Sequence, residues 1–350
     1  MFISNLKTPH VILYTDCGVL CTDQNVCEAY IYHINNTNKD NVMKVQKVEF
    51  KSLGLNLVGN LYLPKGFDAN QQYKTIIVTP PAHQVKEQTP TVYGPLFANL
   101  GFVFFAFDYN SKGESEGYSA DFRNDENSFR KHEDLRNAIS FLCAQPYVDT
   151  DKLYGVGICG GGNIMSSVII SDLRVKAFAS ISAMLATDAM FFSDNVAYKG
   201  MVTAANDARQ RMFEAQKGEN FDLFGYDDPN YLENNPQLSG AQLEGYEFYG
   251  TKRAGSETYS RFSNQVLSNI YESAPINIGE QYADRMLQPF LGVVGEKADT
   301  AIATELFYDK VTSHKELFRV PGASHVDLYD VEEYVSQAAE KIASFFDSQA

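Results

Sequence analysis

The stretch that decides the fold is Leu153-Tyr-Gly-Val-Gly-Ile-Cys-Gly-Gly161. A short apolar strand, 153–158, precedes Cys159, and a helix is predicted over 160–171. Glycines two residues before and two residues after Cys159 give the spacing G-x-C-x-G, in which a sharp turn raises one side chain above a sheet edge. Partial positive charge at the helix N-terminus favours a thiolate, and the N–H of Gly160 points at a developing oxyanion. The pattern predicts a cysteine nucleophile.

Two other interpretations of this stretch stay open. A buried structural cysteine would fit the same glycine-rich turn. The residues Gly155-Val-Gly-Ile-Cys-Gly160 also match G-x-G-x-x-G, which is typical of dinucleotide-binding folds. Such a fold expects an acidic residue at the end of the next strand, about 20 residues further on. The strand predicted at 175–182 ends in Ser182 and contains no acidic residue, so we favour the nucleophile.

Strands and helices alternate on both sides of this turn. Continuous apolar strands, such as Phe-Val-Phe-Phe-Ala-Phe at 102–107, are typical of a sheet that is buried on both faces. The sequence therefore predicts an α/β fold with a mostly parallel central sheet and helices on both faces. The predicted strands are 45–51, 55–63, 74–79, 102–107, 153–158, 175–182, 289–295 and 317–320, and the predicted helices are 89–101, 128–144, 160–171 and 331–345.

The alternation fails between Met184 and Gln288. This part is rich in Tyr, Phe, Asn and Gln, with one helix predicted at 203–216. A parallel crossover needs only a dozen or so residues, usually a helix. We therefore predict a core made of 43–184 and 286–350, and a cap inserted at 185–285 over the active face. A structural elaboration remote from any site is the alternative.

Residues 1–42 differ from the rest of the chain. They contain three of the five cysteines, at positions 17, 21 and 27, and an Asn-rich stretch at 35–41. The cysteine spacing is a weak match to zinc sites, because no fourth ligand lies at a usual distance. Regular periodicity begins at Met43, so we hypothesise that Met43 is the authentic start and that 1–42 is an extension translated from an upstream region.

Composition excludes several classes of protein. Asp and Glu outnumber Lys and Arg by 44 to 29, which gives a formal net charge of −15. Nucleic acid and anionic membrane surfaces are therefore poor partners. The sequence has no apolar run of about 18 residues that could span a membrane, and five cysteines in 350 residues do not make a disulfide scaffold. We expect a cytoplasmic protein, and a homodimer stays open.

A base and an acid follow the nucleophile in the order that such turns require. Asp299 comes directly after the strand 289–295, and His325 comes directly after the strand 317–320. Because carboxyl ends of parallel strands meet at one edge, both loops lie at the edge that holds Cys159. We predict His325 as the base and Asp299 as the acid that orients it. Glu296 and Asp327 are the fallback acids.

An oxyanion hole needs a second backbone N–H besides that of Gly160. The loop after the strand 74–79 reads Pro80-Pro-Ala-His83. Proline cannot donate, so Ala82 or His83 must supply the N–H, and we choose Ala82. His83 is a candidate for direct contact with substrate, although a solvated loop histidine is an equal alternative.

These motifs together resemble a known family. The chain is similar to α/β-hydrolases of the dienelactone-hydrolase-like type, and more closely to bacterial α/β-hydrolases grouped with fungal polyketide acyltransferases. The resemblance covers Met43 to the C-terminus and implies an α/β-hydrolase fold with a triad of Cys159, Asp299 and His325. The sequence departs from the family at 80–83, where such proteins are glycine-rich. The matching stretches are 85–89, 107–117, 146–149, 157–161, 244–249, 297–300 and 322–330.

The expected function is hydrolysis of a carboxylic ester, lactone or thioester through an acyl-cysteine intermediate. The partner would be a small-molecule acyl substrate, and no metal or organic cofactor is expected. Transfer of the acyl group to an alcohol or amine is the first alternative. A non-catalytic binding module on the same fold is the second.

Overall fold

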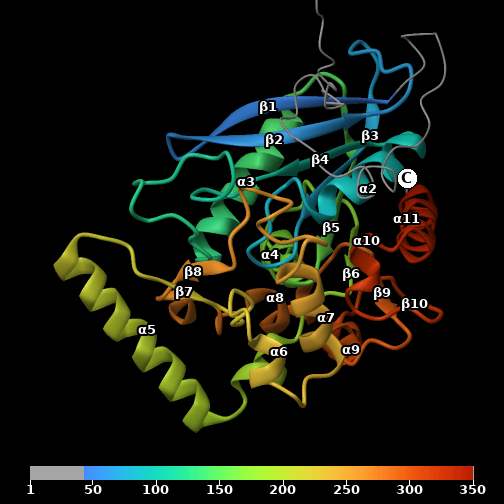
Figure 1. Cartoon of the computed structure of the whole chain (residues 1–350). Coiled ribbons are helices and arrows are strands. Elements are labelled where there is room, and N and C mark those ends of the chain that lie inside the picture. Colours follow the sequence, from blue (N-terminus) through green and yellow to red (C-terminus); the bar gives the residue numbers. More distant parts are fainter. Residues whose placement is uncertain (1–42, 350) are drawn as a thin grey trace, which may run out of the picture.

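The structure is a computed structural model that describes residues 43–349, apart from the side chain of Ala189. The hypothesis about residues 1–42 falls outside this described part. One large sheet forms the centre of the molecule (Figure 1). In spatial order its strands are β1 (Lys44–Ser52), β2 (Leu55–Leu63), β4 (Val103–Phe107), β3 (Tyr73–Thr79), β5 (Val148–Ile158), β6 (Phe178–Ile181), β9 (Phe290–Gly295) and β10 (Lys315–Val320).

The strands from β4 to β10 in this order are parallel to one another. The hairpin of β1 and β2 joins antiparallel at the β4 edge. The predicted mostly parallel sheet is therefore confirmed. Because β3, β5, β9 and β10 run in the same direction, the loops that follow them all leave the sheet at one edge.

Helices cover both faces of the sheet, as the alternation predicts. The covering helices are α2 (Thr89–Asn99), α3 (Ser128–Cys143), α4 (Gly160–Ile169), α9 (Ala301–Lys310), α10 (Asp327–Asp330) and α11 (Glu332–Asp347). In β4, Phe104 packs in the core beneath α2 and α11, whereas its neighbour Phe105 packs in the core beneath α3 and α4. This alternation explains why the strand is apolar throughout, since each face of the sheet has its own core.

One predicted helix start is wrong, and one start agrees with the structure. The helix predicted from 203 is part of α5 (Asn195–Ala215), which begins where the Asp194 side chain accepts hydrogen bonds from the N–H groups of Val196 and Ala197. That carboxylate is a favourable N-cap, and it satisfies N–H groups that would otherwise lack a partner. In α2 the N-cap is Gln88, and Thr89 is the first helical residue.

A long segment joins β6 to β9, and we call it the β6–β9 segment (residues 182–289). Figure 1 shows α5 extending away from the body, whereas α7 lies over the middle of the molecule in this view. The predicted boundaries 185 and 285 stay a prediction. The elements of this segment are η2 (Asp188–Phe192), α5, β7 (Asn220–Asp222), α6 (Tyr231–Asn234), α7 (Gly240–Tyr249), β8 (Gln265–Leu267), η3 (Ile270–Glu272), α8 (Ile278–Gln281) and η4 (Ala283–Arg285).

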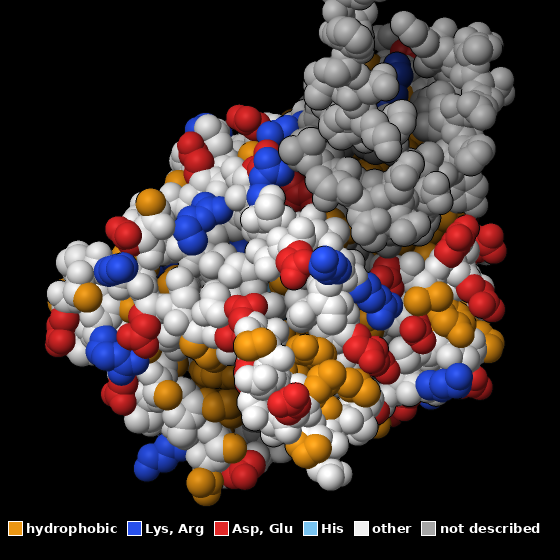
Figure 2. Space-filling model, viewed as in Figure 1, with side chains coloured by type: hydrophobic (Ala, Val, Ile, Leu, Met, Phe, Trp, Pro, Cys, Tyr) orange, Lys and Arg blue, Asp and Glu red, His pale blue; other side chains and the backbone are white. Residues whose placement is uncertain are grey.

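The surface carries mixed charge and scattered apolar groups. On the face in Figure 2, Lys and Arg stand singly among Asp and Glu, and hydrophobic side chains gather in the lower half. Exposed apolar residues of the β6–β9 segment include Val196 and Phe213 on α5. Within residues 43–349, no helix combines the length and the apolar character needed to cross a membrane.

Candidate active site

Cys159 occupies the predicted sharp turn between β5 and α4. Its φ of 48° and ψ of −122° lie in a region that non-glycine residues rarely adopt. The turn is held on both sides, because the Cys159 N–H donates to Ile181 and its carbonyl accepts from Gly162, each at 3.0 Å. A strained backbone that the surroundings enforce is common at functional sites.

Glycine at position 161 allows β3 and α4 to touch. An ideal Cβ on Gly161 would lie 2.1 Å from the carbonyl oxygen of Thr79 and 2.4 Å from that of Pro80. The Thr79 hydroxyl also donates to the Gly161 carbonyl at 2.7 Å. The glycine two residues after Cys159 is therefore required by backbone packing.

Replacing Gly161 by alanine is expected to destabilise the fold by about 3 kcal/mol, because a backbone carbonyl must move to admit the methyl group. Urea denaturation measures the change. The control is Gly200→Ala on α5, where an added Cβ meets nothing within 4 Å and alanine should stabilise the helix by about 0.5–1 kcal/mol. Equal stability of the two variants would contradict the proposed packing role of Gly161.

Two backbone N–H groups converge on the Cys159 sulfur. Burial raises the pKa of the Cys159 thiol, while hydrogen bonds from the Tyr329 hydroxyl and from the N–H groups of Gly160 and Ala82 oppose that rise. The two donors are neighbours, since an ideal Cβ on Gly160 would lie 3.2 Å from the Ala82 nitrogen. The assignment of Gly160 and Ala82 to an oxyanion hole stays a prediction.

His83 lies directly after Ala82 and is buried, not solvated. Its N–H donates to the Glu126 carboxylate at 3.1 Å, which fixes the peptide that joins Ala82 to His83. Lys112 and Lys131 hold Glu126 from the other side. The imidazole nitrogens have no hydrogen-bond partner among the described residues. Burial, helped by Lys112, lowers the pKa of His83 to about 3.

The ring of His83 is enclosed by aromatic side chains of the β6–β9 segment. Phe224, Tyr249 and Phe262 contact it edge-on, with ring centroids 4.8–5.6 Å away. Its predicted role in substrate contact stays a proposal.

His325 lies in the loop after β10 and is 4% exposed. Its Nδ1 pairs with the Thr300 hydroxyl, and its Nε2 lies 2.9 Å from the Tyr329 hydroxyl. Burial lowers the pKa of His325 to about 4, and the nearby Asp299 carboxylate opposes this shift. At neutral pH the imidazole is therefore neutral, as a general base must be.

Asp299 is near His325, but no hydrogen bond between them is found in the described part of the chain. Its carboxylate is exposed and accepts instead from the N–H of Ala241 at 3.3 Å, at the start of α7. The fallback acids also have other partners. Glu296 accepts from Gly322 at 2.8 Å, and Asp327 accepts from Ser324 at 2.9 Å, so both stabilise turns of the His325 loop.

Sequence reasoning missed two residues that contact the imidazole. Thr300 is the neighbour of Asp299, and Tyr329 follows His325 by four residues, which is about one helical turn. Both positions lie within stretches already singled out, but neither residue type suggests a catalytic group by itself.

The β6–β9 segment is fastened to the loops that hold these residues. Glu244 accepts from the N–H of Val326 at 3.0 Å, next to His325. Arg253 forms an ion pair with Asp330, and the Gln84 side chain donates to the Tyr249 hydroxyl at 3.0 Å. These contacts therefore hold the β6–β9 segment against the loops of the candidate site.

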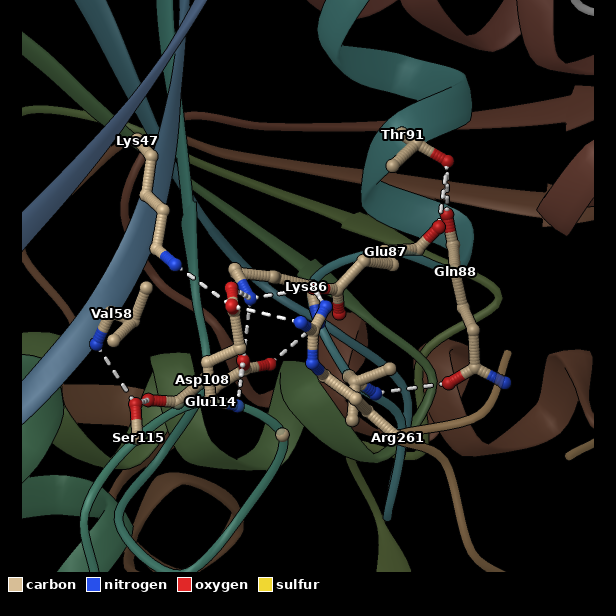
Figure 3. A network of polar contacts seen from close by, with 12 residues as sticks. Lys47, Val58, Lys86, Glu87, Gln88, Thr91, Asp108, Glu114, Ser115 and Arg261 are labelled. Atoms are coloured by element: carbon tan, nitrogen blue, oxygen red, sulfur yellow. Dashed lines mark hydrogen bonds and ion pairs between the residues drawn. The ribbon is translucent and has the colours of Figure 1, made fainter. Parts of the chain in front are cut away.

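Lys86, four residues after Ala82, lies at the centre of a network of charged side chains (Figure 3). Its side chain is 1% exposed, and its ammonium group contacts carboxylates of Glu87, Asp108 and Glu114 at 2.6–2.8 Å. Arg261 of the β6–β9 segment completes the cluster by pairing with Glu114 at 3.1 Å. Among residues 43–349, no group of His, Cys, Asp and Glu side chains is arranged to hold a metal ion.

Comparisons with known proteins agree with this architecture. No protein-family model matches the sequence. The uncharacterized protein PA2218 of Pseudomonas aeruginosa is 30% identical over 323 residues, which cover 86% of this chain and 80% of PA2218. A crystal structure of PA2218 matches with a TM-score of 0.75 and 26% identity over 91% of this chain and 98% of that chain.

Two further relatives extend the comparison. The uncharacterized protein YcjY of Escherichia coli is 28% identical over 84% of this chain and 94% of its own. The polyketide transferase grgF of a Penicillium species is 24% identical over 80% of this chain and 89% of its own. The crystal structure of GrgF, described as an alpha/beta hydrolase, matches with a TM-score of 0.68 and 19% identity over 87% of this chain and 99% of that chain. The sheet order and the likeness to GrgF show the α/β-hydrolase fold, and the chain belongs to the same family as PA2218.

Proposed function

We propose that this protein cleaves a carboxylic ester, lactone or thioester through an acyl intermediate on Cys159. The observation that carries the proposal is the position of the sulfur. It stands at the enforced turn after β5, with the N–H groups of Gly160 and Ala82 directed at it. An acyl carbonyl bound there would place its oxygen near both donors, and loss of one such donor typically costs about 10²–10³-fold in rate.

The proposed reaction begins with attack of the Cys159 sulfur on the carbonyl carbon. His325 receives the thiol proton and returns it to the leaving alcohol or thiol, which leaves a thioester on the enzyme. Water then attacks the thioester, again with His325 as base, and releases the acid. We assign Asp299 to stabilising the imidazolium by its charge, in line with its effect on the pKa of His325. Thr300 holds the tautomer through Nδ1.

Transfer of the acyl group to an alcohol or amine is the second candidate function. It is favoured by the name of the relative grgF, a polyketide transferase. The aromatic side chains near the sulfur, Tyr226 and Tyr249 among them, would suit an apolar acyl group and would limit access of water. Both candidates share the acyl-enzyme, so one experiment can establish that step for either.

The test is the mass of the intact protein after brief exposure to p-nitrophenyl butyrate. We expect one butyryl adduct, located on Cys159 by peptide mapping, and no adduct at this position in Cys159→Ala. The matched control is Cys143→Ala, which removes the other cysteine within the described residues and should leave the adduct intact. Equal labelling of Cys159→Ala and wild type, with no turnover in either, would overturn the proposal and favour a binding module.

The lifetime of the adduct separates the two candidate functions. Rapid loss of butyrate in water alone indicates a hydrolase. A long-lived adduct that is discharged by added alcohols or amines, with formation of the butyryl ester or amide, indicates an acyltransferase.

A further inference from the structure

The Tyr329 hydroxyl lies between the proposed nucleophile and the proposed base. Its oxygen is 2.9 Å from His325 Nε2, and the same hydroxyl interacts with the Cys159 thiol, where it opposes the rise of the thiol pKa. No direct hydrogen bond between Cys159 and His325 is found among residues 43–349. Tyr329 is 2% exposed, so water does not compete for these contacts.

The phenol is held in place by a third contact and by its own helix. The Tyr249 hydroxyl also hydrogen-bonds Tyr329, and Tyr249 itself accepts from the Gln84 side chain at 3.0 Å. Tyr329 belongs to α10, and the preceding carbonyl, that of Leu328, accepts from the buried Tyr93 hydroxyl at 2.7 Å. A phenol fixed from three directions does not need to reorganise when a proton moves.

The possible hydrogen-bond directions are consistent with proton transfer from Cys159 through Tyr329 to His325. When the Thr300 hydroxyl accepts from Nδ1–H of His325, Nε2 is left as an acceptor. Tyr329 has one proton and two lone pairs. It can donate to Nε2, accept from the Cys159 S–H and accept from the Tyr249 O–H, which satisfies all three contacts at once. Burial raises the pKa of Tyr329 well above its usual value, so the phenol starts and ends neutral.

We propose that Tyr329 is a catalytic residue that relays the proton from the Cys159 thiol to His325, an inference that rests on the proposed function. In this step the S–H bond breaks and an O–H bond forms on Tyr329, while the original Tyr329 O–H breaks and an N–H bond forms on His325 Nε2. The net change is a thiolate on Cys159 and an imidazolium on His325. Tyr329 is unchanged, and both hydrogen bonds reverse their direction.

The alternative is that Tyr329 acts as a plug, which blocks proton transfer by separating the proposed nucleophile from the proposed base. The variant Tyr329→Phe distinguishes the two, because it removes the hydroxyl and keeps the ring. A relay predicts that acylation of Cys159 by p-nitrophenyl butyrate becomes about 10²-fold slower, the lower end of general acid–base effects. It also predicts that the pH at which iodoacetamide alkylation of Cys159 reaches half its maximal rate moves upward. A plug predicts rates equal to or faster than wild type.

Tyr154→Phe is the matched control, because it removes the hydroxyl of a buried tyrosine that stacks on Phe346 and that has no role in the proposed site. It should leave both rates and the alkylation pH profile within about twofold of wild type. A similar slowing in both variants would overturn the relay in favour of a structural role for the hydroxyl.

The wild-type protein provides a test that needs no variant. If two protons move in the transition state, a plot of the acylation rate against the deuterium fraction of the solvent is curved. If one proton moves, the plot is a straight line. A straight line would overturn the relay. Absence of any Cys159 adduct in wild type would instead overturn the proposed function, so the two failures are distinguishable.

Discussion

Replacing His325 by glutamine is expected to lower kcat/KM for p-nitrophenyl butyrate about 10⁴-fold. Glutamine is similar in size and can keep a hydrogen bond to Tyr329, but it cannot accept the thiol proton. Because burial raises the pKa of the Cys159 thiol, little thiolate forms without a base. The remaining rate would come from substrate binding and the oxyanion donors. Initial rates under first-order conditions measure the change.

The variant His325→Gln is also expected to change how stability and activity depend on pH. The pKa of His325 is about 4 in the folded protein, below about 6.5 in an unfolded chain. Between these values the unfolded state binds more protons, so stability falls as the pH falls from about 6.5 to 4. His325→Gln should therefore lose less stability over this range than wild type. It should also lose the activity step near pH 4 that arises from protonation of the base.

His132 provides the matched control for these measurements. It is a buried histidine on α3, and burial lowers its pKa to about 4 as well. His132→Gln should change the acid dependence of stability in the same way while leaving kcat/KM within about twofold of wild type. Equal activity of His325→Gln and His132→Gln would contradict the assignment of His325 as the base.

The sharp turn at Cys159 could be predicted from sequence because its geometry is local. The strand, the sharp turn and the helix that position Cys159 all lie within 148–169. Steric packing explains the glycine at position 161, because an added Cβ there would collide with the Thr79 carbonyl oxygen. His325 could be placed at the correct edge from the order of strands alone, since parallel strands end on one side.

The partners of the imidazole could not be predicted in this way. Whether Nδ1 meets Thr300 or Asp299 depends on side-chain directions within one loop, and α7 contributes by offering the Ala241 N–H to Asp299. That contact joins residues 58 positions apart, and α7 belongs to a segment without clear periodicity. The burial of His83 has the same origin, because the rings that cover it come from three separate parts of the β6–β9 segment.

Replacing Lys86 by methionine is expected to destabilise the protein by about 3–5 kcal/mol. The ammonium group contacts three carboxylates (Figure 3), and the Lys86 side chain is almost completely buried. Removing one partner of a buried ion cluster leaves the opposite charges uncompensated, which costs far more than the lost attraction in water. Urea denaturation at pH 7 measures the loss. Because Lys86 lies four residues after Ala82, acylation of Cys159 should slow as well.

The loss of stability in Lys86→Met, relative to wild type, should become smaller as the pH is lowered. Burial and the Asp108 charge raise the pKa of Glu87 and Lys86 opposes this rise, so loss of the cation should raise the pKa of Glu87 further above that of the unfolded chain. The folded variant then binds more protons than the unfolded chain, so its stability falls as the pH rises through that window and is best at the acidic end. Lys47→Met is the matched control, since Lys47 also pairs with Glu114 at 2.8 Å but is 36% exposed. An exposed pair contributes about 0–1 kcal/mol, so equal losses in the two variants would show that burial of the cluster does not determine its energetic importance.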